Sequence, residues 1–375
     1  MNKPEAAPAA TPGRLISLDA LRGFDMFWIV AAEEIVEGLH HLSPSRFIEG
    51  VQRQLTHVEW EGFVFYDLIF PLFVFIAGIS LPLSISRRLE QGESRATIAG
   101  HLAWRAAILF LLGIIYNGGM RSGWSDIRVF SVLGRIAISS LGAGLIYLYF
   151  RPRGQIAWFV AALFGYWAAL TFIPVPDYGA GDYSPLGNLT RYVDQQLLIG
   201  RPHFKEWGFD PEGILSAIPA VGTCLLGVFC GQILQRCDWS SSRKAGSIAL
   251  LGVACLAAGY GWGQSFPIIK SIWTSSFVLA AGGYSCLLLA AFYLLIDVWG
   301  FRAWAFPFVV IGANPLVIYL ATNFVPFQDL ADRLVGGGVA EALGSSAMLV
   351  NALVQFALGF ALLYWLYRRR IHIRI

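Results

Sequence analysis

Residues 62–84 read GFVFYDLIFPLFVFIAGISLPLS, in which Asp67 is the only charged side chain. An α-helix rises 1.5 Å per residue, so about 20 apolar residues are enough for one crossing of the hydrocarbon core of a bilayer. The run therefore predicts a transmembrane helix. It places the chain among integral membrane proteins and makes the other apolar runs the next features to locate.

The composition of the whole chain agrees with this class. Of 375 residues, 56% are hydrophobic and 14% are charged, whereas soluble domains carry roughly 25% charged residues. The 13 Trp, 14 Tyr and 27 Phe residues suit a membrane protein, because aromatic rings collect at the level of the lipid headgroups. These values exclude a soluble domain, a disordered chain, a coiled coil and a secreted disulfide scaffold. The net charge of +3 is too small to indicate a nucleic-acid partner.

Ten apolar runs, separated by Gly, Pro and charged clusters, predict an all-α bundle of about ten transmembrane helices. The first run is the weakest, because Asp25, Glu33, Glu34 and Glu37 interrupt it. The ten runs lie near 20–39, 62–84, 98–116, 129–149, 155–173, 213–234, 245–262, 274–296, 304–322 and 347–367. An even number of crossings places both termini on the same side of the membrane.

The distribution of Lys and Arg predicts which side that is. With the termini inside, the inner segments hold about 15 basic residues in roughly 60 positions, and the outer loops about 9 in roughly 110. This asymmetry favours cytoplasmic termini and an integral protein of a bacterial inner membrane. Residues 1–13 form an Ala/Pro-rich segment without an apolar core, which we expect to be a disordered tail. The remainder, 14–375, is expected to be a single transmembrane domain.

Acidic side chains gather near the predicted outer ends of the first two spans. Glu33 and Glu34 lie a turn or two below the outer end of the first span, and Asp67 lies at a similar depth in the second. Antiparallel spans are expected to bring the three carboxylates together roughly 7 Å below the outer surface, at 1.5 Å per residue. His57 is predicted to lie above them. A carboxylate that holds one imidazole tautomer favours a general base, although a lone loop histidine is also typical of plain surface.

Basic and acidic residues alternate at the inner end of the first span, in the order Arg14, Asp19, Arg22 and Asp25. One interpretation is anchoring of the helix end, with mutual neutralisation and Arg side chains reaching the membrane interface. The other is a site for phosphate groups at the inner face. The residue pattern leaves both open.

Three further polar residues lie inside predicted spans, where each needs a partner or a function. Arg105 and Arg135 lie in the third and fourth spans, and Asn314 lies beside Pro315 in the ninth. For Arg135, an ion pair with a buried acid competes with a ligand role. For Asn314, a hydrogen bond between helices competes with a ligand role.

Sequence blocks spread along most of the chain resemble the heparan-alpha-glucosaminide N-acetyltransferase family, in particular its shorter prokaryotic members, within the wider transmembrane acyltransferase superfamily. The blocks are RLISLDALRGFDMFW (14–28), HVEWEGFVFYDLIFPLFVFIAG (57–78), AWR (103–105), WSDIR (124–128), VLGR (132–135), DPEG (210–213), KSIWTSS (270–276) and GANPL (312–316).

The resemblance implies transfer of an acetyl group from cytosolic acetyl-CoA to the amine of a glucosamine-type sugar across the membrane. It assigns the catalytic histidine to His57. Because coenzyme A carries phosphates, its binding needs cations at the inner face. We expect Arg14 and Arg22 there, with Asp19 positioning them, and Arg105 and Arg135 as further candidates.

On the outer side, Asp67 is expected to assist His57 in taking a proton from the amine, and an acetyl-histidine intermediate is a second route. Glu33 and Glu34 are expected to attract the ammonium form of the acceptor. Trp60 is expected to stack on the sugar ring, and Asn314 is a further candidate for substrate binding.

A secondary transporter for a sugar or an amine is the alternative, in which buried carboxylates bind a cation and broken helices control access. No convincing internal repeat supports it. The cysteines show no CxxC pair and no metal-ligand spacing, so no metal is expected. The expected partners are the amino-sugar or glycan acceptor and membrane lipid, and a homodimer is left open.

Overall fold

The computed structural model describes all residues except 1–14, 44, 120, 122, 124–125 and 374–375. Within this described part every regular element is a helix, and the loops contribute isolated β-bridges only. The all-α prediction is therefore confirmed. The predicted tail, 1–13, and Arg14 lie outside the described residues.

Eight segments of the described chain are long and apolar enough to cross a membrane. Six of them begin and end within four residues of predicted spans, whereas Phe65–Glu90 ends six residues later than predicted and Gly338–Arg368 begins nine residues earlier. They are α4 (Phe65–Glu90), α5 (Arg95–Tyr116), α6 (Val132–Tyr149), α7 (Pro152–Phe172), α9 (Ala217–Gln235), α10 (Ser241–Gly263), α11 with η3 (Ser275–Phe292, Tyr293–Val298), and α16 (Ala347–Arg368) preceded by α15 (Gly338–Leu343) and η5 (Gly344–Ser346).

Serine side chains fix the starts of several of these helices. Ser94 Oγ accepts a hydrogen bond from Thr97 N at 3.1 Å before α5, and Ser131 Oγ accepts one from Gly134 N at 2.9 Å before α6. The first N–H groups of a helix have no intrahelical partner, so these caps satisfy donors that would otherwise be lost. Beyond the caps, lipid offers the backbone no partners, and internal helical bonding is the stable solution.

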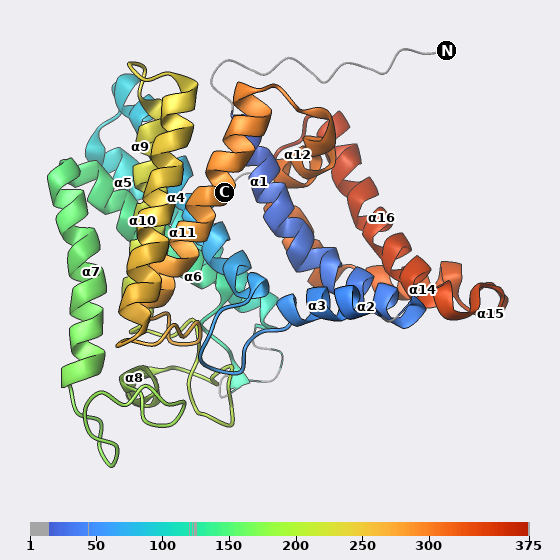
Figure 1. Ribbon diagram of the computed structural model, residues 1–375, viewed down its shortest axis with the longest axis horizontal. Helices are drawn as coiled ribbons and strands as arrows, with labels where there is room; N and C mark the ends of the chain where they lie inside the picture. Colours follow the sequence, from blue (N-terminus) through green and yellow to red (C-terminus); the bar gives the residue numbers. More distant parts are fainter. Residues whose placement is uncertain (1–14, 44, 120, 122, 124–125, 374–375) are drawn as a thin grey trace.

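The first predicted span is a continuous helical segment formed by α1 (Ile16–Phe27), the π-helical turn η1 (Trp28–Ala32) and α2 (Glu33–Leu42). Its charges keep it outside the eight apolar segments. In Figure 1, α1 lies between α11 and α12, and its Ala20 and Leu21 are fully buried. A helix enclosed by other helices can carry charged side chains, because they do not face lipid. The count of ten spans remains a prediction that depends on this segment.

The ninth predicted span is broken in the middle. Helices η4 (Ala303–Ala305) and α12 (Phe306–Ala313) lead to Asn314, where the axis bends by 65° into α13 (Pro315–Phe324). Pro315 takes the first position of α13, where its missing N–H costs nothing. Counted as one span, this pair raises the number of candidate spans to nine.

Helices α1 and α12 approach closely because glycines face the opposite backbone. A Cβ on Gly23 would lie 1.7 Å from Phe308 O, and one on Gly312 would lie 1.9 Å from Asp19 O. Any larger side chain at either position would force the helices apart. The contact holds α1 against the broken span and so fixes one wall of the cavity described below.

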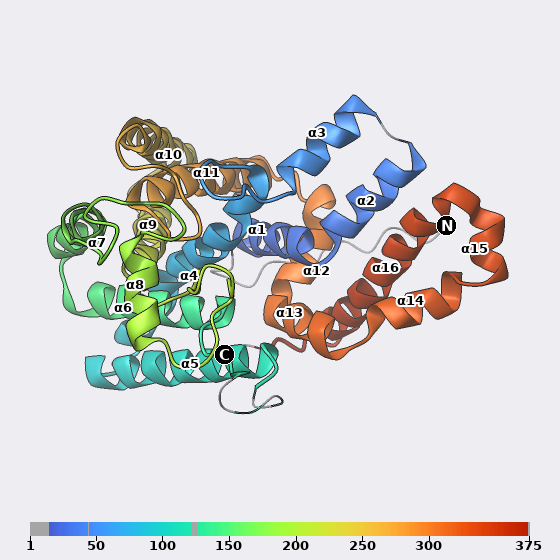
Figure 2. The ribbon, with the colours of Figure 1, turned by 90° about the horizontal axis from the view of Figure 1, so that it is seen from below.

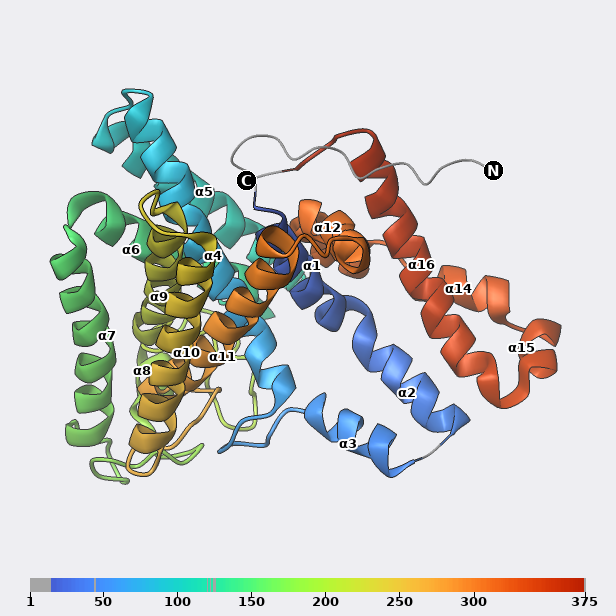
Figure 3. The same ribbon diagram turned by 45° about the horizontal axis from the view of Figure 1, so that its top comes forward.

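Short helices gather at the end of the bundle where α4 begins. They are α3 (Arg46–Gln54), α8 (Leu189–Leu197) and α14 (Phe327–Val335), joined there by α15 (Figure 1). In Figures 2 and 3, α2 and α14 flank α16, and both pack against it. We name this the outer end and the end where α1 begins the inner end, after the sides that the loop charges predict.

Candidate active site

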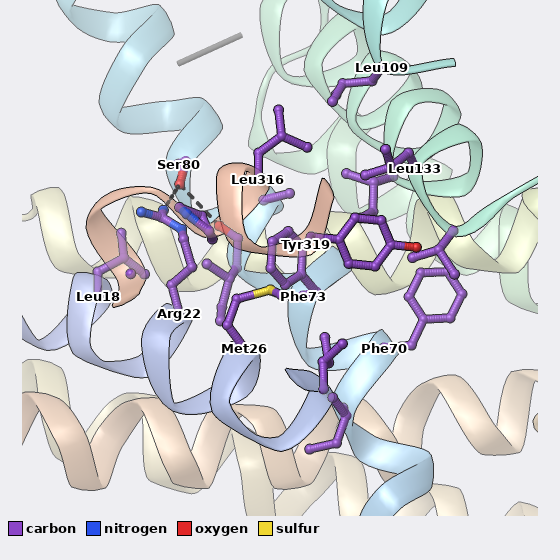
Figure 4. A pocket seen from close by; sticks show the side chains of 18 of the residues that line it. Leu18, Arg22, Met26, Phe70, Phe73, Ser80, Leu109, Leu133, Leu316 and Tyr319 are labelled. Atoms are coloured by element: carbon purple, nitrogen blue, oxygen red, sulfur yellow. Dashed lines mark hydrogen bonds between the residues drawn. The ribbon is translucent and has the colours of Figure 1, made fainter. Parts of the chain in front are cut away.

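A cavity of about 640 Å³ runs through the bundle between α1, α4, α5, α6 and the broken span. Its middle is apolar, with Met26, Phe70, Phe73, Leu133 and Leu316 in the lining. Figure 4 shows these side chains around a common space, with Arg22 and Ser80 on one side of it. A cavity of this size can hold much of a drug-sized or cofactor-sized ligand.

The two ends of the cavity lie far apart along α4. Tyr66, at the outer end, and Ser80, toward the inner end, both line the cavity, and the 14 residues between them correspond to about 21 Å at 1.5 Å per residue. His57 stacks on Tyr66 with ring centroids 4.7 Å apart, whereas Arg22 Nη2 donates to Ser80 Oγ at 3.2 Å. The cavity therefore joins a histidine at one end to an arginine at the other.

His57 and Asp67 are in contact at the outer end, as predicted. His57 Nδ1 lies 2.7 Å from Asp67 Oδ1, and the side chain of His57 is half exposed while that of Asp67 is buried. Asp67 lies in the first turn of α4, and its Oδ2 also accepts a hydrogen bond from Val64 N at 3.2 Å. A buried carboxylate held in this way can fix one imidazole tautomer and stabilise the imidazolium.

The sequence-based reasoning gave no role to Lys270, which completes this cluster. Its Nζ lies 3.3 Å from Asp67 Oδ1, and 3.0 and 3.2 Å from the two ring nitrogens of His57. Lys270 lies in the connection between α10 and α11. Burial lowers the pKa of Lys270, and the Asp67 carboxylate opposes that effect. The signal that could have found it was its place at the head of the KSIWTSS block.

The acidic cluster differs from the prediction. Glu33 and Glu34 are exposed on the protein surface rather than buried beside Asp67. Glu33 still reaches the site indirectly, because its Oε2 accepts a hydrogen bond from Tyr66 OH at 3.3 Å. The π-helical turn before α2 lies between the buried α1 and these residues, and it changes which helix face they occupy.

Trp60 lies outside the cavity lining. Its Nε1 donates to Tyr183 O at 2.9 Å, and its ring packs edge-on against Trp207 and Phe209. These contacts fasten the His57 loop to the outer loops. These contacts favour a positioning role for Trp60, and the sugar-stacking role expected from the sequence stays a prediction.

Arg135 also lies outside the cavity lining and is fully buried. Its Nη atoms donate to Ser216 O at 2.8 Å, Pro211 O at 2.7 Å and Ser216 Oγ at 2.6 Å. The bonded segment is the turn that precedes α9. Of the two interpretations of Arg135, these bonds support the structural one, with backbone carbonyls in place of the expected acid.

An ion-pair network holds the same turn at the outer end. Arg128 donates to both oxygens of Asp210 at 2.8 and 2.9 Å, and to Glu212 Oε2 at 2.5 Å. Burial and the neighbouring Asp210 raise the pKa of Glu212 to about 7. Burial alone would raise the pKa of Asp210, but the Arg128 guanidinium lowers it. One arginine thus binds one ionised carboxylate and one carboxyl that titrates near neutrality.

The inner end carries the remaining predicted cations. Arg22 Nη1 donates to Asp19 Oδ1 at 3.2 Å, which matches the expected positioning of Arg22 by Asp19. Arg105 lines the cavity, and its buried Nε has no hydrogen-bond partner among the described residues. An unpartnered guanidinium N–H beside an apolar wall favours an anionic or carbonyl ligand.

Asn314 holds the C-terminal segment. Its Nδ2 donates to Ile371 O at 2.9 Å, and its Oδ1 accepts from Ile373 N at 2.9 Å. Both halves of the amide are therefore engaged with backbone, far from His57 along the cavity. Of the two interpretations of Asn314, these bonds support the structural one, and a role in substrate binding stays a prediction. The described residues contain no cluster of ligating side chains that would hold a metal ion.

A helical bundle with a His–Asp–Lys cluster at one end of an internal cavity and cations at the other defines a polytopic membrane protein with the features of a catalytic site. The family model for heparan-alpha-glucosaminide N-acetyltransferase, catalytic, matches residues 14–261. The chain therefore belongs to this family, and the resemblance drawn from the sequence blocks is confirmed.

Two curated relatives carry the name heparan-alpha-glucosaminide N-acetyltransferase. The human protein is 28% identical over 427 aligned residues, which cover 98% of this chain and 61% of the relative. The mouse protein is 26% identical over 377 residues, which cover 85% of this chain and 56% of the relative. The chain thus spans about three fifths of the length of these relatives.

Proposed function

We propose that this chain is a membrane N-acetyltransferase that moves an acetyl group from acetyl-CoA to the amine of a glucosamine-type sugar. The observation that carries the proposal is a single cavity with arginines at one end and the His57–Asp67 pair about 21 Å away along α4 at 1.5 Å per residue. Family membership and the names of the relatives support the same reaction.

The donor enters at the inner end. The phosphates of coenzyme A bind Arg22 and Arg105, which are the cations of the lining at that end. Arg14 remains a proposed contributor from outside the described residues. The pantetheine arm occupies the apolar middle of the cavity, and the thioester reaches the outer end. Figure 4 shows the apolar side chains that line the cavity between Arg22 and Tyr319.

The acceptor arrives at the half-exposed His57 from the outer side. Its ammonium form is attracted by the exposed carboxylates of Glu33 and Glu34, and it must lose a proton before the amine nitrogen can attack. His57 takes the proton released during attack, because Asp67 holds its ring and stabilises the imidazolium. The protonated His57 then returns a proton to the departing thiolate of coenzyme A.

Direct attack and transfer through an acetyl-histidine differ in one species, which is an acetyl group on His57. Rapid quenching of the enzyme with labelled acetyl-CoA, before an acceptor is added, distinguishes them. A label on the peptide that contains His57 indicates the two-step route, and its absence indicates direct attack.

The experiment that tests the function uses purified protein in sealed proteoliposomes of known orientation. Acetyl-CoA is supplied on the inner face and glucosamine on the outer face, and N-acetylated product is measured on each side. We expect product on the outer face, with acetyl-CoA consumed on the inner face. Absence of acetyl transfer from acetyl-CoA to any tested amine, in liposomes and in detergent, overturns the proposal.

The sidedness has its own measurement. In a Cys237→Ser background, Gly50→Cys should react with an impermeant thiol reagent from the outer face only, and His372→Cys from the inner face only. Reaction of both from one face would mean an even number of spans between positions 50 and 372 and would remove the route between the two ends. Placement in a bacterial inner membrane with cytoplasmic termini is part of this proposal.

A transporter is favoured only by the helix break at Asn314, because broken helices are typical of transport sites. The break offers little to a transported ion, since both polar atoms of the Asn314 side chain bind backbone. Uptake of labelled glucosamine without consumption of acetyl-CoA would support the transporter instead.

A further inference from the structure

Lys270 occupies an unusual place for a residue outside the family-matched stretch, 14–261. It lines the cavity, and its Nζ lies within 3.3 Å of both His57 and Asp67. An atom in the imidazole plane about 3 Å from both ring nitrogens would collide with the carbon between them. The ammonium therefore lies over the face of the ring, so its N–H groups are not committed to a ring lone pair.

The loop that carries Lys270 is tied down at several points. Gly62 N donates to Ile268 O at 2.9 Å, which joins this loop to the His57 loop. Ile269 N donates to Thr274 Oγ1 at 3.0 Å, and that hydroxyl also donates to Pro267 O at 2.8 Å. These bonds leave the backbone around Lys270 little freedom relative to His57.

The strained backbone at Trp273 indicates that the surrounding structure holds the Lys270 loop in this conformation. Trp273 has φ of 53°, a left-handed conformation that is rare for a bulky residue. Such a backbone conformation is unfavourable, persists only where the surrounding structure holds it, and clusters at functional sites. Here Trp273 is buried, and its Nε1 donates to Thr223 Oγ1 at 3.1 Å.

Arg135 completes the support of this loop. Its guanidinium carbon lies 5.1 Å from the centre of the Trp273 ring, in a cation–π contact. The same guanidinium binds the carbonyls of the turn before α9. A buried arginine therefore links the strained residue to the bundle, and the rigidity of the Lys270 loop follows from packing in the interior.

The charges at the outer end balance only if Lys270 is a cation. Asp67 is buried, so its negative charge needs a buried partner. During acetyl transfer His57 becomes positive and the acetyl oxygen becomes negative. With Lys270 present, the cluster has no net charge both before attack and in the tetrahedral intermediate. Without it, Asp67 would balance the imidazolium, and the new oxyanion would leave the cluster with one net negative charge.

We propose that Lys270 is a catalytic residue that donates a hydrogen bond to the acetyl carbonyl oxygen of the thioester as negative charge develops there. This inference rests on the proposed acetyl transfer. The neutral amine nitrogen forms a bond to the carbonyl carbon, the π-electron pair moves to the oxygen facing Lys270, and His57 takes the proton from nitrogen. The pair then returns, the C–S bond breaks, and the imidazolium protonates the thiolate.

The test compares Lys270→Met, Lys270→Arg and the wild type in acetyl-CoA turnover. Removal of one oxyanion donor reduces kcat by roughly 100- to 1,000-fold in well-studied enzymes. We expect a loss of that size for Lys270→Met, a KM for acetyl-CoA within about threefold of the wild type, and partial recovery in Lys270→Arg. Lys205→Met, which removes an exposed lysine from another outer loop, is the matched control and should retain full activity.

A double-mutant cycle separates this role from simple neutralisation of Asp67. If Lys270 acts on the carbonyl, adding Lys270→Met to Asp67→Asn still costs roughly a hundredfold in kcat. If Lys270 only neutralises Asp67, the second change costs nothing, and the inference is overturned.

Two further measurements distinguish a folding defect from loss of the proposed hydrogen bond. Stabilisation by coenzyme A in a thermal shift assay shows whether Lys270→Met is folded, and if it is not, Lys270→Arg carries the test. The infrared carbonyl band of bound ¹³C-acetyl-CoA should shift to lower frequency in the wild type and less in either variant. Wild-type protein that transfers no acetyl group refutes the proposed function, whereas normal turnover by Lys270→Met refutes only the role of Lys270.

Discussion

The two ends of the cavity differ in how their charges are arranged. At the outer end, Asp67 contacts both His57 and Lys270 within 3.3 Å, and the loops around them are cross-linked by hydrogen bonds. At the inner end, the buried Nε of Arg105 has no partner among the described residues. A cluster whose charged groups hold one another in place before any ligand binds is preorganised for catalysis. The Arg105 N–H, beside an apolar wall, is instead available to an anion.

The largest expected effect is at the outer end. His57→Ala should lower acetyl transfer by a hundredfold or more, because a general base contributes roughly 10²- to 10⁴-fold. Binding of coenzyme A should be unchanged, since His57 lies far from Arg22 along the cavity. Steady-state turnover and thermal stabilisation by coenzyme A measure the two properties. His41→Ala, on an exposed part of α2, is the control, and near-normal turnover in His57→Ala would refute the assignment.

Substitutions at the inner end should instead change the KM for acetyl-CoA. Removal of Arg22 or Arg105 should raise the KM for acetyl-CoA roughly tenfold or more, because a hydrogen bond to a charged group contributes about 1.5–3 kcal/mol. The effect on kcat should be small, since these residues do not touch the reacting atoms. Arg153→Ala removes an exposed cation at the same end and serves as the control. An unchanged KM in the double variant would contradict the two-ended arrangement.

Stability should depend on pH through Glu212. Its pKa is raised from 4.5 to about 7 in the folded protein, so the folded state holds this proton more tightly than the unfolded state. The resulting stabilisation is fully present below pH about 4.5 and is lost as the pH rises through about 7. The melting temperature should therefore fall between pH 5 and 8, and less so in Glu212→Gln.

The raised pKa of Asp194, about 6, acts in the same direction, so the difference between wild type and variant isolates Glu212. Glu206→Gln removes an exposed carboxylate from the same loop and should follow the wild type. Parallel pH curves for wild type and Glu212→Gln would show that this carboxyl does not titrate in the range.

The smallest expected effect concerns the loop that positions His57. Trp60→Phe removes the hydrogen bond to Tyr183 O and should cost about 1 kcal/mol in unfolding free energy. Turnover should change by less than tenfold, because Trp60 lies outside the cavity. Trp158→Phe, on the exposed face of α7, should leave both properties unchanged. A large rise in acceptor KM for Trp60→Phe would restore the sugar-stacking role.

The membrane-spanning helices were predictable from the sequence, because each crossing needs about 20 predominantly apolar residues. The run at 62–84 became α4, which begins three residues later and ends six residues later, and the run at 347–367 became α16, which differs by one residue at its end. The contact of His57 with Asp67 was also predictable, since ten residues of one loop and one helix turn separate them. Local spacing was sufficient in these cases.

Long-range placement was not predictable in the same way. Lys270 is 213 residues from His57 in sequence, and only the packing of α4 beside α11 brings them together. Most partners of Arg135 and both partners of Asn314 are backbone groups, which leave no trace in residue identity. Glu33 and Glu34 lie exposed directly after the π-helical turn at Trp28–Ala32, and no periodic pattern signals such a turn.

The sequence by itself determined that this chain is a helical membrane protein and determined the family to which it belongs, because hydrophobic length and extended motifs are linear properties. The tertiary structure alone decided that the arginines and the histidine share one cavity and that a lysine completes the outer cluster. The physical reason is that charge pairing and cavity walls depend on which helices are neighbours, and helix neighbours are fixed by packing.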